Sequence, residues 1–464
     1  MNERLSTLDA SFLYLEKPNV HMHVAGLAIL DPSTRPDGRL GIDDITRLIE
    51  QRIHLVPRFR QRVVFPPLSA GRPVWADDPT FDLEFHTRRA ALPAPGGRRE
   101  LADFVQRVHS RPLDRTKPLW EMYLIEGLED DHVAILSKSH HAMIDGLSGM
   151  DIATVMFDFS ADTAEVKAPT AWEPSPEPAP GDLWLDAIRD QISHPVRTAV
   201  ENAARAIRAP QEAWHRVRTT LGGVAAVLAK GQADAGPFNG RIGSNRRFAM
   251  AEVPVADMKA IKNALGGTVN DVVLASVTGG LRTLLRSRKE RVTGVTLRAM
   301  VPVSTRDDSR TMALGNQVSM FFVDLPVGVR DPVKRLRTIS RETEQLKSSH
   351  AAVGAAAIMN TARWAPPTLH ALAARLVSRS RFANLVVSNV PGPQVPLYLA
   401  GAKLVIVYPV MPLAETLGLS VAVTSLSGTM GFGFTSDWGS IPDIDVMANG
   451  LLDAISDLKK AARV

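Results

Sequence analysis

The chain of 464 residues contains no cysteine. Disulfide bonds, thiolate zinc sites and a cysteine acyl-enzyme are therefore excluded. The chain also has no apolar run of about twenty residues, the length that crosses a bilayer. Its first residues, MNERLSTLDASFLYLEK, do not join a basic start to an unbroken apolar stretch, so we expect no secretory signal. These absences lead us to expect a cytoplasmic protein, either soluble or peripheral to the inner membrane.

Aromatic residues are scarce, at 6%, and the charges are nearly balanced, with 54 Lys and Arg against 49 Asp and Glu. The net charge of +5 comes without zinc-finger spacing, an arginine-rich tail or aromatic platforms, so we expect no nucleic-acid partner. A mild basic excess suits an anionic lipid surface or a phosphate-bearing ligand. Ordinary solvated surface charge explains most of these arginines equally well.

Hydrophobic residues make up 45% of the chain, enough for two lobes with full cores. A proline-rich stretch over 161–181 predicts an exposed, semi-extended connector. We therefore predict an N-terminal lobe over 1–160, a connector with amphipathic helices over 161–240, and a C-terminal lobe over 241–464. The helical apolar spacing within 185–228 indicates helices packed on the body of the protein or, alternatively, helices at a lipid interface.

Apolar patterns predict a mixed α/β fold. In the N-terminal lobe the expected strands are 20–30, 120–125 and 132–139, the last two being antiparallel neighbours. In the C-terminal lobe they are 295–303, 317–325, 384–387, 420–424 and 430–435, followed by a closing helix over 443–462. Thr268 is the expected N-cap of another helix, with Asp271 as its capping-box partner. We therefore give Thr268 and Asp271 a structural role.

The chemically most informative stretch is HHAMIDG, from His140 to Gly146, which follows an apolar strand pattern. Neighbouring side chains on a strand point to opposite faces, so only one of His140 and His141 can enter a given cavity. That geometry argues against a metal site. The histidines and Asp145 have two possible roles. They could form a hydrogen-bonded structural cluster with no catalytic function, or one histidine could be a base that takes a proton from a hydroxyl.

The stretch HHAMIDG matches the HHxxxDG signature of the coenzyme-A-dependent acyltransferase superfamily. Further stretches resemble the bacterial wax ester synthase/diacylglycerol acyltransferase family in the family's order: Leu5–Asp9, Val20–Val24, Pro118–Trp120, Asn270–Asp271 and Ser388–Pro393. The resemblance spans nearly the whole chain, apart from the region between 161 and about 236.

This resemblance implies a two-lobed chloramphenicol acetyltransferase-like α/β fold with mixed sheets and an active-site tunnel between the lobes. It implies an O-acyltransferase that joins a long-chain acyl group from acyl-coenzyme A to diacylglycerol, to a fatty alcohol, or to both. Acyl-coenzyme A would be a substrate, and no cofactor is expected. His141 would be the general base, with His140 supporting the strand, Asp145 anchoring the loop and Gly146 allowing the turn. Such an enzyme could also reside on lipid droplets.

Other residues of the matching stretches are candidates for the tunnel or for oxyanion binding. Asn270 could bind a substrate or the oxyanion, and Ser388 and Asn389 could offer polar groups at the mouth of the site. The SNVPGP stretch also reads as a rigid turn. Trp120 is a candidate wall element, although a core position is the commoner one for such a residue.

Competing chemistries have less support. No G-x-S-x-G elbow and no G-x-x-x-x-G-K-[ST] loop is present, so neither a serine acyl-enzyme nor nucleotide-dependent chemistry is expected. An amide-forming condensation domain, which shares the HHxxxDG signature, remains an alternative. A non-catalytic lipid-binding or droplet protein that retains the fold is another.

Overall fold

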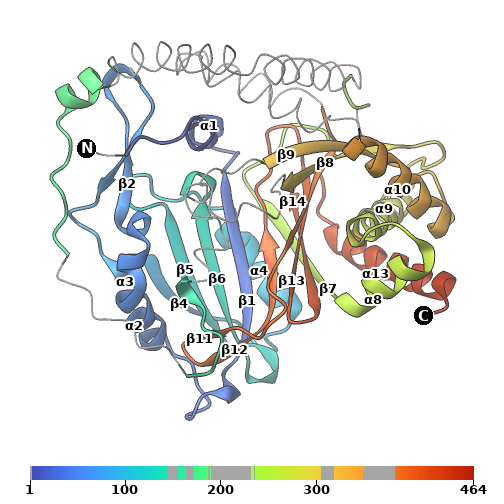
Figure 1. Cartoon of the computed structure of the whole chain (residues 1–464), viewed down its shortest axis with the longest axis horizontal. Coiled ribbons are helices and arrows are strands. Elements are labelled where there is room, and N and C mark those ends of the chain that lie inside the picture. The colour runs from blue at the N-terminus through green and yellow to red at the C-terminus, as the bar shows by residue number, and fades with distance from the viewer. Residues whose placement is uncertain are drawn as a thin grey trace, which may run out of the picture.

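The computed structural model describes residues 3–69, 71–143, 155–162, 172–186, 189, 231–234, 236–304, 318–348 and 382–464. Within them, two six-stranded sheets form the centres of two lobes (Figure 1). Both sheets mix parallel and antiparallel pairs, as predicted. No helix in these ranges is long and apolar enough to cross a membrane.

The first sheet has the strand order β11-β12-β1-β6-β5-β4. Its strands are β1 (His23–Asp31), β4 (Thr87–Ala91), β5 (Trp120–Glu126), β6 (Val133–His140), β11 (Tyr398–Leu399) and β12 (Ala402–Val410). The predicted antiparallel pairing of β5 with β6 is confirmed. Because β6 lies between β1 and β5, the histidine pair is at the end of an interior strand.

Helices and a small hairpin complete the N-terminal lobe. They are α1 (Thr7–Leu15), α2 (Ile42–Arg52), α3 (Leu83–His86), α4 (Arg98–His109) and the hairpin of β2 (Gln61–Val64) with β3 (Val74–Asp77). One apolar cluster joins α1 and α2 to the sheet, and another joins α4 to the sheet. The first sheet is therefore packed on both faces.

The second sheet has the order β7-β14-β13-β10-β8-β9. Its strands are β7 (Arg246–Pro254), β8 (Leu297–Ser304), β9 (Val318–Leu325), β10 (Leu385–Pro391), β13 (Leu419–Leu426) and β14 (Thr429–Asp437). Four helices pack against it in one continuous core: α8 (Val255–Leu265), α9 (Val269–Ser287), α10 (Pro332–Ser348) and α13 (Ile444–Ala462). The predicted strands and the closing helix are present within a few residues.

The lobes do not follow the sequence as simply as predicted. Strands β11 and β12 belong to the predicted C-terminal lobe but pair within the N-terminal sheet, β12 lying beside β1. The backbone of β12 passes so close to β14 that a Cβ on Gly431 would lie 2.1 Å from the Val407 oxygen, and one on Gly433 would lie 1.8 Å from the Pro409 oxygen. Glycine at these two positions therefore lets the sheets meet.

The predicted connector can be followed only in part. Residues 172–179 have no regular secondary structure and lie along the β2–β3 hairpin, where the Ser175 amide donates to Asp77 and Glu177 pairs with Arg62. Most of the predicted amphipathic helices, from 187 to 228, lie outside the described residues apart from Arg189.

Candidate active site

The two histidines of the motif have separate surroundings at the end of β6. His140 is the last residue of the strand and is 1% exposed. His141 begins a short 3-10 turn, is half-buried, and stacks on Phe12 of α1 with ring centroids 4.0 Å apart. Its amide donates to the Met22 oxygen at 2.8 Å. The His141 backbone is therefore tied to the chain that enters β1.

A half-buried carboxylate lies against His140. Glu16, directly after α1, has its Oε1 atom 3.3 Å from His140 Nε2 and 3.4 Å from His23 Nε2. Arg115 contacts the other carboxylate oxygen, with its Nε donating at 3.0 Å. Burial alone would raise the pKa of Glu16, but the contacts with His140, His23 and Arg115 prevail and hold it well below its usual range. Glu16 is therefore ionised at neutral pH.

The other ring nitrogen of His140 supports the turn that carries His141. His140 Nδ1 accepts a hydrogen bond from the Ala142 amide at 3.0 Å, so the proton of a neutral His140 is on Nε2, the atom that faces Glu16. A connected path then runs from the carboxylate of Glu16 through His140 to the residue after His141. This path fixes the backbone of His141 from its C-terminal side.

Further titratable side chains fill the space behind His140. His21 stacks on His23 with centroids 5.3 Å apart, and His109 Nε2 lies 3.3 Å from the Met411 oxygen. Burial lowers the pKa of His21, lowers that of His23 to about 3, and lowers that of His109 well below its usual value. These three imidazoles are therefore neutral at neutral pH.

Lys138 adds a cation to the same region. Its Nζ atom donates to the backbone oxygens of Val108 at 3.0 Å and Arg111 at 2.6 Å, at the end of α4. Burial lowers the pKa of Lys138 to about 8. The region behind His140 is thus a buried polar cluster, which we define as Glu16, His21, His23, His109, Lys138 and His140. Within the described ranges, no group of three or more His, Asp or Glu side chains is arranged to hold a metal ion.

Sequence reasoning missed Glu16 and the partnership of His23. His21 and His23 entered the prediction only as part of a matching stretch, and nothing in the spacing of Glu16 marks it as a partner of a strand more than a hundred residues away. Asp145 and Gly146 lie outside the described residues, so their predicted roles stay predictions.

Residues 155–158, which follow the motif in the sequence, are held by Arg52 of α2. Nη2 of Arg52 donates to both carboxylate oxygens of Asp158, at 2.8 and 2.9 Å, and both residues are buried. Nη1 of Arg52 donates to the backbone oxygens of Val155 and Met156. The end of this segment is therefore fixed to α2.

The structure brings two of the polar candidates together. Asn270, in the first turn of α9, and Asn389, on β10, are 119 residues apart in sequence, yet Asn389 Nδ2 donates to Asn270 Oδ1 at 3.4 Å. Ser388 is the preceding residue of β10, and both Ser388 and Asn389 are half-buried. These amides lie beside the N-terminus of α9, where backbone N–H groups favour negative charge.

Asp271 is occupied by structural contacts. The predicted capping box is present: the Asp271 amide donates to Thr268 Oγ1 at 3.2 Å, and the Thr268 amide donates to the Asp271 carboxylate at 2.8 Å. Thr343 and Ser340 of α10 also donate to that carboxylate, at 2.7 and 3.2 Å. The carboxylate of Asp271 therefore anchors α9 to α10.

Trp120 lies in the core of the N-terminal lobe. Its ring is 1% exposed and is stacked on Phe59 and on His86, with centroid distances of 4.7 and 4.5 Å. Its indole N–H donates to the Phe59 oxygen at 2.9 Å. The side chain therefore packs as a core residue, and a role as a wall of the tunnel stays a prediction.

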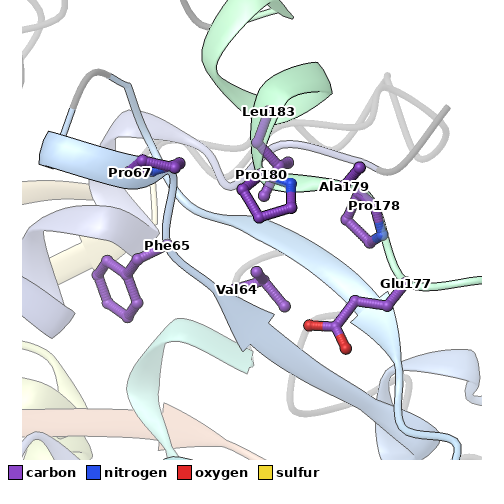
Figure 2. Close-up of a pocket in the computed structure, with 8 residues that line it drawn as sticks. All are labelled: Val64, Phe65, Pro67, Glu177, Pro178, Ala179, Pro180 and Leu183. Atoms are coloured by element: carbon purple, nitrogen blue, oxygen red, sulfur yellow. The ribbon is translucent and has the colours of Figure 1, made fainter.

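A surface hollow of about 470 Å³ lies in the N-terminal lobe between the end of β2 and the connector. Figure 2 shows Phe65, Val64 and Pro67 on one side and Pro180 and Leu183 on the other. None of the predicted site residues lines this hollow. The tunnel between the lobes also stays a prediction, because residues 144–154, which include the end of the motif, are outside the described ranges.

The two mixed sheets and the HHxxxDG stretch at the end of β6 define an acyltransferase of the chloramphenicol acetyltransferase type. Residues 5–273 match the model of the wax ester synthase/diacylglycerol acyltransferase catalytic domain, and residues 314–459 match that of the WS/DGAT C-terminal domain. The chain belongs to the wax ester synthase/diacylglycerol acyltransferase family.

Individual relatives agree with this assignment. The chain is 34% identical to a putative diacylglycerol O-acyltransferase of Mycobacterium tuberculosis, over 98% of this chain and 90% of the relative. It is 32% identical to the probable diacylglycerol O-acyltransferase tgs1 of the same species, over 98% and 95%.

Solved structures agree as well. The wax ester synthase/diacylglycerol acyltransferase from Marinobacter aquaeolei VT8 superposes with a TM-score of 0.70 at 30% identity, over 99% of this chain and all of that one. The first condensation domain of the calcium-dependent antibiotic synthetase has a TM-score of 0.60 at 14% identity, over 100% and 96%. This second likeness is one of fold alone.

Proposed function

We propose that the protein transfers a long-chain acyl group from acyl-coenzyme A to the hydroxyl of diacylglycerol, and also to fatty alcohols, with His141 as the general base. The observation that carries the proposal is the setting of His141. Its ring is half-buried against Phe12, while its backbone is held by Met22 on one side and, through Ala142 and His140, by Glu16 on the other.

The proposed reaction is a direct transfer within a ternary complex. A neutral imidazole, with a reference pKa of about 6.5, accepts the hydroxyl proton as the oxygen attacks the thioester carbonyl. The tetrahedral intermediate then collapses, the carbon–sulfur bond breaks, and the imidazolium returns the proton to the coenzyme A thiolate. No acyl-enzyme forms on this route, and no cofactor takes part.

We propose that Asn270 binds the oxyanion of the tetrahedral intermediate. The amide of Asn270 can donate through its Nδ2 atom, because its Oδ1 atom already accepts from Asn389. The N-terminus of α9 adds backbone dipoles of the favourable sign. Donors of this kind are worth about 3–4 kcal/mol where they have been tested.

We propose that Glu16 and His140 are positioning residues. Glu16 holds the His140 ring, and the His140 ring holds the turn that carries His141. The acyl chain and the acceptor are both insoluble in water, so we further propose that the enzyme works at a membrane or lipid-droplet surface. A water-poor tunnel would protect the thioester from hydrolysis.

The test supplies radiolabelled palmitoyl-coenzyme A with diacylglycerol and, separately, with hexadecanol. Wild type should form triacylglycerol, wax ester or both, and His141→Ala should lose nearly all of either product. His132→Ala, a half-buried histidine just before β6, is the matched control and should keep its activity. Equal product from wild type and His141→Ala would refute the mechanism. No product from wild type with either acceptor would favour a non-catalytic lipid-binding protein.

A further inference from the structure

The positive charge of the chain is concentrated in two short segments of the C-terminal lobe. Residues 282–291 and 330–341 together hold ten basic and two acidic residues, a net charge of +8. The other 442 residues hold 44 basic and 47 acidic residues, a net charge of −3. These 22 residues therefore carry more than the whole net charge of +5.

The structure places the two segments next to each other. The first covers the end of α9 and the four residues after it, and the second covers the two residues before α10 and the first part of that helix. Arg282 ties the first segment to the chain just before the second, because its Nη1 atom donates to the backbone oxygens of Val327 and Gly328. The pKa of Arg282 is lowered, first by burial and then by the nearby charges of Arg286 and Arg330.

Most of these cations face solvent. On α10 the spacing of Lys334, Arg337 and Arg341 puts them on one face of the helix, and Leu336 and Ile339 are buried in the core. We define the basic face as the exposed residues Arg286, Lys289, Arg291, Arg330, Lys334, Arg337 and Arg341. None of these seven side chains forms an ion pair with the residues that the structure describes.

The remaining charged residues of the two segments are not part of the basic face. Arg288 pairs with Asp443, and Arg335 is buried against α9, where its Nε atom donates to the Ala275 oxygen. Asp331 caps α10 by accepting from the Lys334 amide. Glu290 is exposed beside the basic face, and Glu344, one turn beyond Arg341, marks its end.

We propose that the basic face docks the protein on an anionic phospholipid surface. Lys and Arg side chains close to an anionic leaflet gain about 1 kcal/mol each, and this attraction falls off within a Debye length, so basic residues on other faces gain little. The two segments contain no aromatic residue on which nucleic-acid bases could stack. The inference rests on the proposed function only for the expectation that the acceptor is a lipid. Figure 1 shows α9 and α10 on the side of the second sheet that faces away from the N-terminal lobe.

The test is sedimentation of the full chain with vesicles of phosphatidylcholine alone and with vesicles that also contain phosphatidylglycerol. Wild type should bind only the second kind, and more weakly as salt is raised. The triple variant K334Q/R337Q/R341Q should bind those vesicles about 100-fold more weakly. The control R39Q/R107Q/K403Q removes the same charge from exposed residues elsewhere and should change the affinity less than about threefold.

Three results would overturn the proposal. They are equal binding of wild type to both vesicles, an equal loss in the control variant, and binding to duplex DNA without binding to vesicles. Circular dichroism should show both triple variants folded, since glutamine is a good helix former. Acyl transfer to an acceptor in neutral detergent should be the same for wild type and both variants. If wild type lacks that activity, the proposed function is refuted, whereas the docking proposal is still decided by the vesicle experiment.

Discussion

Replacing Glu16 by Gln tests how the turn that carries His141 is held. The substitution keeps the size of the side chain and one oxygen but removes the charge that faces His140 at 3.3 Å and His23 at 3.4 Å. Both are electrostatic contacts and not hydrogen bonds of good geometry, so we take about 1 kcal/mol for each, the scale of an ordinary polar contact. Two weakened contacts therefore amount to about 2 kcal/mol. If the loss is felt in the transition state, kcat falls roughly 10–50-fold.

Steady-state kinetics with palmitoyl-coenzyme A and diacylglycerol measures the effect. Because Glu16 holds the base and does not contact substrate in this account, KM should stay within about twofold while kcat falls. Glu126→Gln is the control: Glu126 pairs with the exposed Arg89, and pairs of that kind contribute about 0–1 kcal/mol. A Glu16→Gln enzyme with unchanged kcat, or one whose KM alone rises, would refute the positioning role.

Three further outcomes follow from the same structure. Asn270→Ala should lower kcat roughly 100-fold or more in steady-state kinetics. Thr268→Ala should leave most of kcat but lower the free energy of unfolding, measured by urea denaturation, by about 1 kcal/mol. Gly433→Ala, whose Cβ would lie 1.8 Å from a backbone oxygen of β12, should cost at least about 2 kcal/mol of stability, whereas Gly240→Ala, with open space around it, should cost little. Burial lowers the pKa of His23 to about 3 in the folded protein. In the unfolded chain the same histidine takes up a proton near pH 6.5, whereas in the folded protein it stays neutral at that pH. The free energy of unfolding should therefore fall as pH drops from about 6.5, by at most about 1.4 kcal/mol per pH unit for this group, and His23→Asn should flatten that dependence in denaturation curves.

The parts of the fold that local pattern determines could be predicted from the sequence. Alternating and helical apolar spacing located the strands and the closing helix, because burial of one face imposes the period of the element. The capping box of Thr268 with Asp271 was readable because its two partners are three residues apart. The additional bonds from α10 to Asp271 were not readable, since they come from residues about seventy positions away.

The parts that depend on long-range assembly were out of reach. The pairing of β12 with β1 joins residues from opposite ends of the chain, and only the glycines of β14 hint at the close approach. Glu16 meets His140 because α1 ends beside the entrance to β1, a placement that no local spacing encodes. Asn270 and Asn389 were separate candidates in the sequence, and only the structure brings them within 3.4 Å of each other.

The most direct test of the central claim is a single-turnover experiment with excess enzyme, palmitoyl-coenzyme A and diacylglycerol, comparing wild type with His141→Ala. Loss of a general base predicts a rate lower by about 10²–10⁴. Intact-mass measurement before the acceptor is added should show no acylated protein in either sample. An unchanged rate in His141→Ala, or an acyl-enzyme that forms and then decays as product appears, would contradict direct transfer assisted by His141.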